Sequence, residues 1–170
     1  MTVKKILTEP SKLLRIKSKL VESVGREEQK LMNDMLETMY DANGIGLAAI
    51  QIGIPKRIIV MDIDKNEQKP IYFVNPVIKN KNLEKAKYEE GCLSVPNQFA
   101  EIERPNSCEV EYLDYDGKKK ILKANGLLAT CIQHEMDHLE GILFIDYLSK
   151  LKKSMIVKKL SKNKSDRIIV

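Results

Sequence analysis

The sequence has few of the residues that build disulfide frameworks, and no long apolar runs. Its three cysteines, Cys92, Cys108 and Cys131, are odd in number and widely spaced, so they do not form a disulfide framework. No apolar stretch approaches the roughly 18 residues that a membrane-spanning helix needs. The opening residues MTVKKILTEP also lack the apolar run of a secretory signal. We therefore expect a cytoplasmic protein rather than a secreted or membrane-spanning one.

Histidine is equally scarce, and both histidines lie in the stretch IQHEMDHLEG, residues 132–141. On a helix, His134 and His138 would share one face with their β-carbons about 5–6 Å apart, so both imidazoles could reach one ion. Glu135 would point roughly 100° away, where it could act on a water held by that ion. The alternative is a helix with two surface histidines, but the surrounding residues are apolar, and unpaired polar groups are costly to bury there. This HExxH pattern predicts a metal site with a general base.

The remaining patterns predict one α+β domain over residues 1–170, since 43% hydrophobic content suffices for one core. GIGLAAIQIGIP is too rich in glycine and alanine to be a confident strand, whereas RIIVMDID and PIYFVNPVI are strand-like. The pair Asp116-Gly117 predicts a hairpin turn. We expect mostly antiparallel sheets packed around a central helix that carries the HExxH motif. Helical spacing predicts helices over residues 26–43, 126–139 and from 146 to about 161, the last belonging to an amphipathic basic segment over 146–165.

A catalytic metal site of this kind needs a third protein ligand, and no third histidine exists. The thiol of Cys131 precedes His134 by three residues, but a row of ligands on one helix would enclose an ion poorly. Cys108 lies in a hairpin strand, where a cysteine usually acts as a small buried hydrophobe. Cys92 lies in the turn-like EEGCLSVP, from which a separate element could deliver a ligand. The residues alone favour Cys92 by a modest margin and leave carboxylates of the tail as candidates.

Three stretches together resemble the signature motifs of the peptide deformylases: GIGLAAIQ (residues 44–51), EGCLSV (90–95) and QHEMDHLEG (133–141). They occur in the family's order, and the resemblance covers nearly the whole chain. It implies a metal-dependent hydrolase that removes the formyl group from the N-terminal formyl-methionine of newly synthesised polypeptides and releases formate. The nascent N-formylmethionyl polypeptide would then be the partner, in the bacterial cytoplasm or in the matrix or stroma of an organelle of bacterial descent.

The resemblance also implies roles for individual residues. Cys92, His134 and His138 would hold one divalent ion, natively Fe²⁺, with Zn²⁺, Ni²⁺ or Co²⁺ also possible in a purified sample. A metal-bound hydroxide would attack the formyl group, with Glu135 as general acid and base. The Gln51 side chain and the Leu93 backbone N–H would stabilise the oxyanion. The substrate would pair strand-like with the segments around two glycines and place its methionine in an apolar pocket; the candidates for this binding site are Gly46, Gly91, Ile45, Tyr88, Leu127 and Cys131.

Two regions depart from a simple match. Phe99 stands near the place where some bacterial members carry an arginine that holds the far end of the substrate. The lysine-rich C-terminal helix is expected to pack on the domain, and its alternative role is contact with ribosomal RNA; neither membrane nor DNA is expected as a partner.

Two other classes of protein share part of this pattern. A metalloprotease would share HExxH but needs a downstream ligand and a second lobe, and a non-enzymatic metal-binding or RNA-binding protein would need no base at Glu135.

Overall fold

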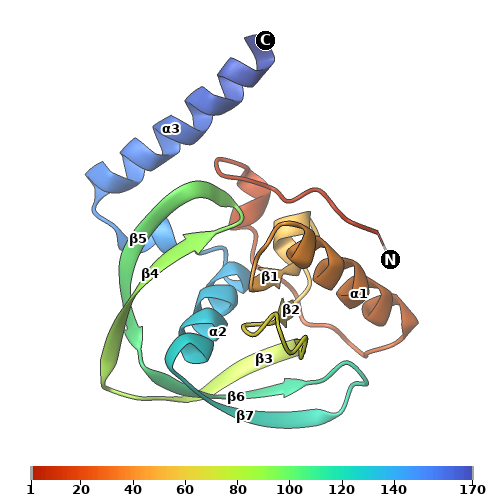
Figure 1. Ribbon diagram of the computed structural model, residues 1–170. Coiled ribbons are helices and arrows are strands. Elements are labelled where there is room, and N and C mark those ends of the chain that lie inside the picture. Colours follow the sequence, from red (N-terminus) through yellow and green to blue (C-terminus); the bar gives the residue numbers. More distant parts are fainter. Residues whose placement is uncertain (1, 170) are drawn as a thin grey trace.

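The fold places one helix between two antiparallel sheets (Figure 1). The computed structural model describes residues 2–169, with side chains described through residue 162. The elements are, in chain order, η1 (Lys12–Arg15), α1 (Arg26–Asp41), β1 (Gly46–Ala48), η2 (Ala49–Ile52), β2 (Ile58–Met61), β3 (Ile71–Lys81), β4 (Lys85–Cys92), β5 (Val95–Pro105), β6 (Ser107–Leu113), β7 (Lys119–Asn125), α2 (Gly126–Leu139), η3 (Phe144–Tyr147) and α3 (Lys150–Ile169). The predicted α+β class with antiparallel sheets around the HExxH helix is confirmed.

The larger sheet has the strand order β1-β2-β3-β6-β7, and β4 and β5 form a separate two-stranded sheet. All strand pairs are antiparallel. The predicted hairpin at Asp116-Gly117 is confirmed as the β6–β7 turn, where Leu113 pairs with Lys119. The β4–β5 hairpin was not predicted beyond a short extended run near Cys92, yet it reaches back from Cys92 to pair Lys85 with Pro105.

The core lies on both faces of the larger sheet. Strand β2 is buried along its whole length, and its side chains alternate between the faces. Ile58 and Val60 belong to the core cluster that contains the α1 methionines, whereas Ile59 and Met61 belong to the cluster that contains the apolar residues of α2. Helices α1 and α2 therefore cover opposite faces of one sheet, and this packing fixes α2 beside β1.

Two predicted segments differ in detail from the structure. GIGLAAIQIGIP divides into the short strand β1 and the 3-10 turn η2. Asp146, the predicted start of the last helix, lies instead in η3, because its carboxylate accepts a hydrogen bond from the backbone of Leu143 at 3.0 Å and closes a turn there. Helix α3 then begins at Lys150 and extends away from the sheets (Figure 1).

Helix α3 packs only part of its apolar face. Leu160 is buried and Ile156 packs against the same core cluster, whereas Leu151 and Met155 are 72% and 52% exposed. The expectation that this helix packs on the domain thus holds for one stretch of its face. In the described part of the chain, no helix has the length and apolar character needed to cross a membrane.

Candidate metal centre and active-site cavity

The structure brings Cys92, His134 and His138 together. The two histidines lie one turn apart on α2, and Cys92 ends strand β4. Their ligand atoms all lie within 4.8 Å of one another, and Cys92 Sγ is 3.4 Å from His138 Nε2. No other such cluster of histidine, cysteine and carboxylate groups occurs among the residues whose side chains are described. Cys92 therefore supplies the thiol that the HExxH pattern lacks, and a strand delivers it.

This donor set fits a divalent transition metal. One thiol and two imidazoles suit zinc, iron, nickel or cobalt, and three protein ligands leave one tetrahedral position for water or substrate. Nδ1 of His134 is 2.9 Å from Oε1 of Glu90, so that nitrogen is engaged and Nε2 is left for an ion. Burial lowers the pKa of His138, which favours the neutral imidazole that a metal requires. At His134, burial acts in the same direction, but the hydrogen bonds with Cys92 and Glu90 outweigh it and raise the pKa of this imidazole.

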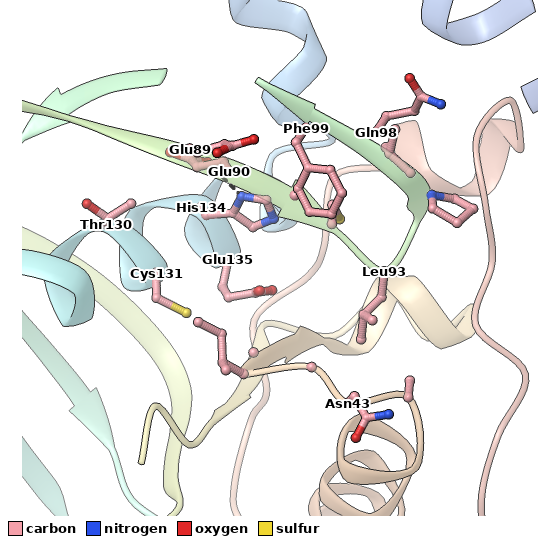
Figure 2. A pocket seen from close by; sticks show the side chains of 18 of the residues that line it. Asn43, Glu89, Glu90, Leu93, Gln98, Phe99, Thr130, Cys131, His134 and Glu135 are labelled. Carbon is pink, nitrogen blue, oxygen red and sulfur yellow. Dashed lines mark hydrogen bonds and ion pairs between the residues drawn. The ribbon is translucent and has the colours of Figure 1, made fainter. Parts of the chain in front are cut away.

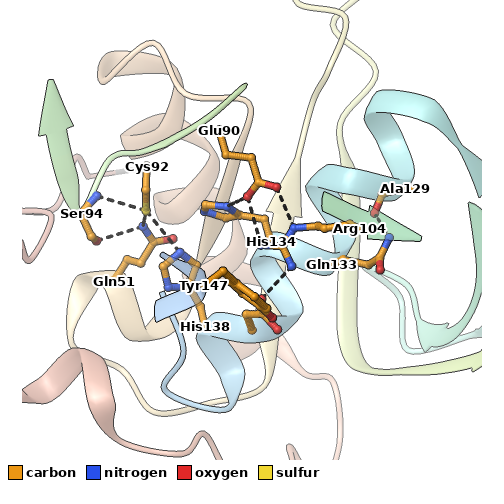
Figure 3. A network of polar contacts seen from close by, with 11 residues as sticks. Gln51, Glu90, Cys92, Ser94, Arg104, Ala129, Gln133, His134, His138 and Tyr147 are labelled. Carbon is orange, nitrogen blue, oxygen red and sulfur yellow. Dashed lines mark hydrogen bonds and ion pairs between the residues drawn. The ribbon is translucent and has the colours of Figure 1, made fainter. Parts of the chain in front are cut away.

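Beside Cys92, His134 and His138 lies a network of charged side chains (Figure 3). Arg104, on β5, donates from Nε to Glu90 at 2.7 Å and from Nη2 at 3.0 Å. Its third nitrogen, Nη1, donates to Asp137 at 2.8 Å. Burial disfavours the ionised Glu90, but the hydrogen bonds from His134 and Arg104 outweigh it and lower the pKa of this carboxyl. Sequence reasoning missed these residues, although Glu90 and Asp137 lie within two of the quoted motifs.

Glu135 forms part of the cavity wall beside Cys131 (Figure 2). Its side chain is buried, and within residues 2–162 its Oε2 has no hydrogen-bond partner. Burial raises the pKa of Glu135 to about 7, so that the carboxyl can accept and return a proton near neutral pH. A β-carbon at Gly46 would lie 2.7 Å from Glu135 Oε1, so only a glycine lets β1 approach this closely.

Gln51 is held in one orientation rather than exposed on a loop. Its Oε1 accepts a hydrogen bond from the backbone N–H of Ala48 at 2.9 Å. Its Nε2 therefore faces the other way, donates to Ser94 Oγ at 3.0 Å and lies 3.6 Å from Cys92 Sγ. The side-chain amide is thus preorganised beside the ligand cluster.

A cavity of about 530 Å³ opens beside this cluster. Its walls come from the α1–β1 connection and β1, from the β4–β5 hairpin, and from α2. All six residues predicted to bind substrate line it, together with Leu93, Phe99, Gln51, His134 and Glu135; the six are Ile45, Gly46, Tyr88, Gly91, Leu127 and Cys131. The third cysteine, Cys108, is buried in β6 outside the cavity, as expected.

Comparison with known proteins gives a consistent result. The family model described as polypeptide deformylase matches residues 3–154. The peptide deformylase of Pelagibacter ubique is 79% identical over 172 residues and covers 100% of both chains. The crystal structure of peptide deformylase from Ehrlichia chaffeensis has a TM-score of 0.95 at 42% identity, covering 98% of this chain and 99% of that one. A second structure from the same organism, in complex with actinonin, has a TM-score of 0.93 at 45% identity and covers 96% and 98%.

Proposed function

The chain belongs to the polypeptide deformylase family, whose metal-dependent enzymes remove the formyl group from nascent peptides, and we propose that Cys92, His134 and His138 hold the metal for this reaction. The observation that carries the proposal is the meeting of these three ligand groups beside a buried carboxyl in an apolar cavity. A divalent ion held there would supply Lewis acidity, which would activate a water near neutral pH and polarise a carbonyl oxygen.

Glu135 handles the protons. Its carboxylate accepts a proton from the attacking water, and the C–N bond of the formamide breaks as the protonated carboxyl delivers that proton to the departing amine. The products are formate and a peptide with a free N-terminal methionine. A pKa near 7 suits both transfers at neutral pH, and positioned proton transfer of this kind contributes about 10²- to 10⁴-fold in rate.

Two donors stabilise the negative charge that develops on the formyl oxygen. The first is Nε2 of Gln51, whose orientation is fixed by the bond from Ala48 to its Oε1. The second is the backbone N–H of Leu93, in the turn that joins β4 to β5. Donors already oriented before the reaction need no reorganisation, and losing one such donor typically costs about 10²- to 10³-fold in kcat.

The peptide binds in an extended conformation between β1 and the end of β4. Strand β1 is at the edge of the larger sheet and β4 pairs only with β5, so both strands offer a free edge among the described residues. Free edges accept an extended peptide as an added strand. Gly46 and Gly91 lie on these two edges, and the methionine side chain enters the apolar part of the cavity lined by Ile45, Tyr88, Leu127 and Cys131.

The native ion of this proposal is Fe²⁺, with Zn²⁺, Ni²⁺ or Co²⁺ able to occupy the same ligands. The donor set accepts all four, so the assignment to iron rests on the resemblance to the family. Elemental analysis of protein purified without oxygen checks it: about one iron per chain is expected, together with loss of deformylation on exposure to air.

The site of action that we propose is the cytoplasm of a bacterial cell, at ribosomes that synthesise the substrate. The exposed face of α3 carries Lys152, Lys158 and Lys159, which could contact ribosomal RNA, whereas Lys153 pairs with Asp146 at 2.7 Å. Sedimentation with ribosomes should fall steeply with salt and with charge reversal at these three lysines. Salt-independent or absent binding would remove the ribosome from the proposal.

The decisive experiment measures formate release from formyl-Met-Ala-Ser by iron-loaded protein purified without oxygen. We expect the wild type to turn over, and Glu135→Gln to bind metal but lose at least about 10²-fold in kcat. Cys92→Ala should lose both metal and activity. If the wild type and Glu135→Gln bind metal stoichiometrically, Cys92→Ala does not, and none of the three releases formate, the assigned reaction is wrong although the ligand set stands.

A further inference from the structure

The two metal-binding histidines are supported in different ways. Nδ1 of His134 bonds to Glu90, whereas Nδ1 of His138 is buried and has no hydrogen-bond partner within residues 2–162. A hydrogen bond to the second ring nitrogen fixes the tautomer and the direction of a ligating imidazole. The orientation of His134 therefore depends on what holds Glu90.

Arg104 holds Glu90, and it is itself held on two sides. The guanidinium forms a two-point contact with Glu90, and the side chains of this pair are each only 5% exposed. Such a forked contact restricts both the position and the rotation of the carboxylate. The remaining nitrogen of Arg104 bonds to Asp137, three residues after His134 on α2.

Tyr147, in η3, completes this series of hydrogen bonds. Its hydroxyl donates to Oδ2 of Asp137 at 2.7 Å, the same oxygen that accepts the bond from Arg104. The Arg104 guanidinium carbon also lies 5.0 Å from the centre of the Tyr147 ring, within cation–π range. Tyr147 thus contacts Arg104 through its ring and braces it through Asp137.

A second residue of η3 reaches the same histidine independently. The Phe144 ring stacks on His134, with ring centres 6.2 Å apart and planes inclined by 25°. The four-residue turn η3 therefore acts on His134 through Phe144 directly and through the chain Tyr147–Asp137–Arg104–Glu90. No contact of Tyr147 with the cavity is needed for this effect, and Tyr147 is not among the cavity-lining residues.

We propose that Tyr147 is a positioning residue of the metal centre, which fixes the direction of the His134 imidazole through Asp137, Arg104 and Glu90. The proposal rests on the function proposed above, since it takes His134 to be a ligand. It assigns η3 a role beyond connecting α2 to α3: the turn aligns one ligand from outside the cavity. The bracing effect should weaken with each step away from the histidine.

Cobalt-loaded protein tests the proposal, because Co²⁺ bound by a thiolate and imidazoles absorbs visible light in a way that reports ligand geometry. Tyr147→Phe keeps the ring over Arg104 and removes only the hydroxyl. Its control is Tyr115→Phe, since Tyr115 packs on Tyr72 in the core cluster of α1, away from the metal ligands. The quantities to measure are the Co²⁺ dissociation constant by competition with a chelator, the visible spectrum, and kcat and KM with formyl-Met-Ala-Ser.

We expect Tyr147→Phe to raise the Co²⁺ dissociation constant about 3- to 10-fold, less than the roughly 10- to 100-fold expected when the direct partner is removed in Glu90→Gln. The visible bands should shift and kcat should fall, while KM stays within about twofold, because ligand alignment rather than peptide binding changes. Asp137→Asn should fall between these two variants.

A purely structural role for Tyr147 gives a different pattern. Tyr147→Phe would then unfold at a lower temperature but match Tyr115→Phe in its Co²⁺ dissociation constant and spectrum, and the proposal would be overturned. If the wild type itself binds no Co²⁺, the metal site fails and the positioning role fails with it. If the wild type binds Co²⁺ and only the Tyr147 effect is missing, the proposed function stands and this inference alone is wrong.

Discussion

The charged network of Glu90, Arg104 and Asp137 (the wall) and the cavity edge at Phe99 and Gly91 (the rim) are built on opposite principles. In the wall, charged side chains from β4, β5 and α2 are bonded to one another, and Glu90 and Arg104 are the buried pair at its centre. At the rim, an exposed apolar side chain packs on backbone that carries no side chain: Phe99 is 65% exposed and lies against Gly91. Side chains hold each other in the wall, whereas the backbone sets the shape of the rim.

This difference separates the two tasks of the site. Ligands must be held to within a fraction of an ångström for chemistry, and buried hydrogen-bonded networks provide that rigidity. Peptides of varied sequence must pass the rim, and contacts to backbone and apolar surface tolerate such variation. Changes in the wall should therefore affect folding and metal binding, and changes at the rim should affect only substrate binding.

The largest effect should follow from breaking the wall. Arg104→Leu removes the two-point partner of a buried carboxylate and leaves Glu90 with only its bond to His134. Losing one member of a buried ion pair costs about 3–5 kcal/mol. Urea unfolding of the metal-free protein measures this loss. Lys87→Leu is the control, because its ion pair with Glu101 is 3.8 Å long and both side chains are more than 60% exposed. The control should change the unfolding free energy by less than about 1 kcal/mol.

Equal losses in the two variants would contradict the distinction between wall and surface. A further check combines Arg104→Leu with Glu90→Leu, which removes both charges. This double variant should be more stable than Arg104→Leu alone, since the penalty comes from the unpaired carboxylate rather than from the missing contact.

The second-largest effect is expected at Gly46, where strand β1 packs against the Glu135 side chain between the wall and the rim. A methyl group there would lie 2.7 Å from Glu135 Oε1 and 3.1 Å from Cys131 Sγ, so Gly46→Ala must displace the Glu135 carboxyl, the proposed general base. We expect kcat to fall about 10²-fold, the typical cost of a displacement near 1 Å, with Co²⁺ binding unchanged. Combining it with Glu135→Asp, which shortens the carboxylate, should give less than the sum of the two losses. Additive losses would mean that the methyl group acts elsewhere.

The sequence predicted those features of the fold and of the site that depend on the spacing of residues close together in the chain. The four-residue separation of His134 and His138 placed them on one helix face, and α2 has the predicted bounds of residues 126–139. Helix α1 and the β6–β7 hairpin followed from apolar periodicity and from a turn dipeptide. Cys92 remained one of several candidate ligands until the family resemblance, because the spacing of residues does not show which strand reaches a helix.

The wall could not be predicted because it depends on long-range contacts between ordinary residue types. Glu90 reaches Arg104 across the β4–β5 hairpin and reaches His134 across 44 positions of the chain. Along β4, Ala86, Tyr88 and Glu90 are less exposed than the residues between them, but a charged residue at the most buried of these positions breaks the apolar alternation by which a sequence reveals an inward face. Tyr147 lies in η3, a turn that helical periodicity assigned to the following helix, and this error concealed its contact with Asp137.

The smallest effect is expected at the rim, from Phe99→Ala. The Phe99 ring covers Gly91 at the cavity. In the binding mode proposed above, an extended peptide leaves the cavity here, so we expect the ring to bury a side chain that follows the formyl-methionine. Burial of about 40 Å² of apolar surface is worth about 1 kcal/mol, or roughly fivefold in KM. The ratio of KM for formyl-Met-Leu-Leu to KM for formyl-methionine amide should rise by that factor, with kcat, Co²⁺ binding and stability unchanged. Leu83→Ala, which truncates a 95% exposed side chain outside the cavity, is the control. If the ratio changes equally in both variants, the Phe99 ring makes no specific contact with the substrate. If Phe99→Ala weakens Co²⁺ binding instead, the rim and the wall are not separate.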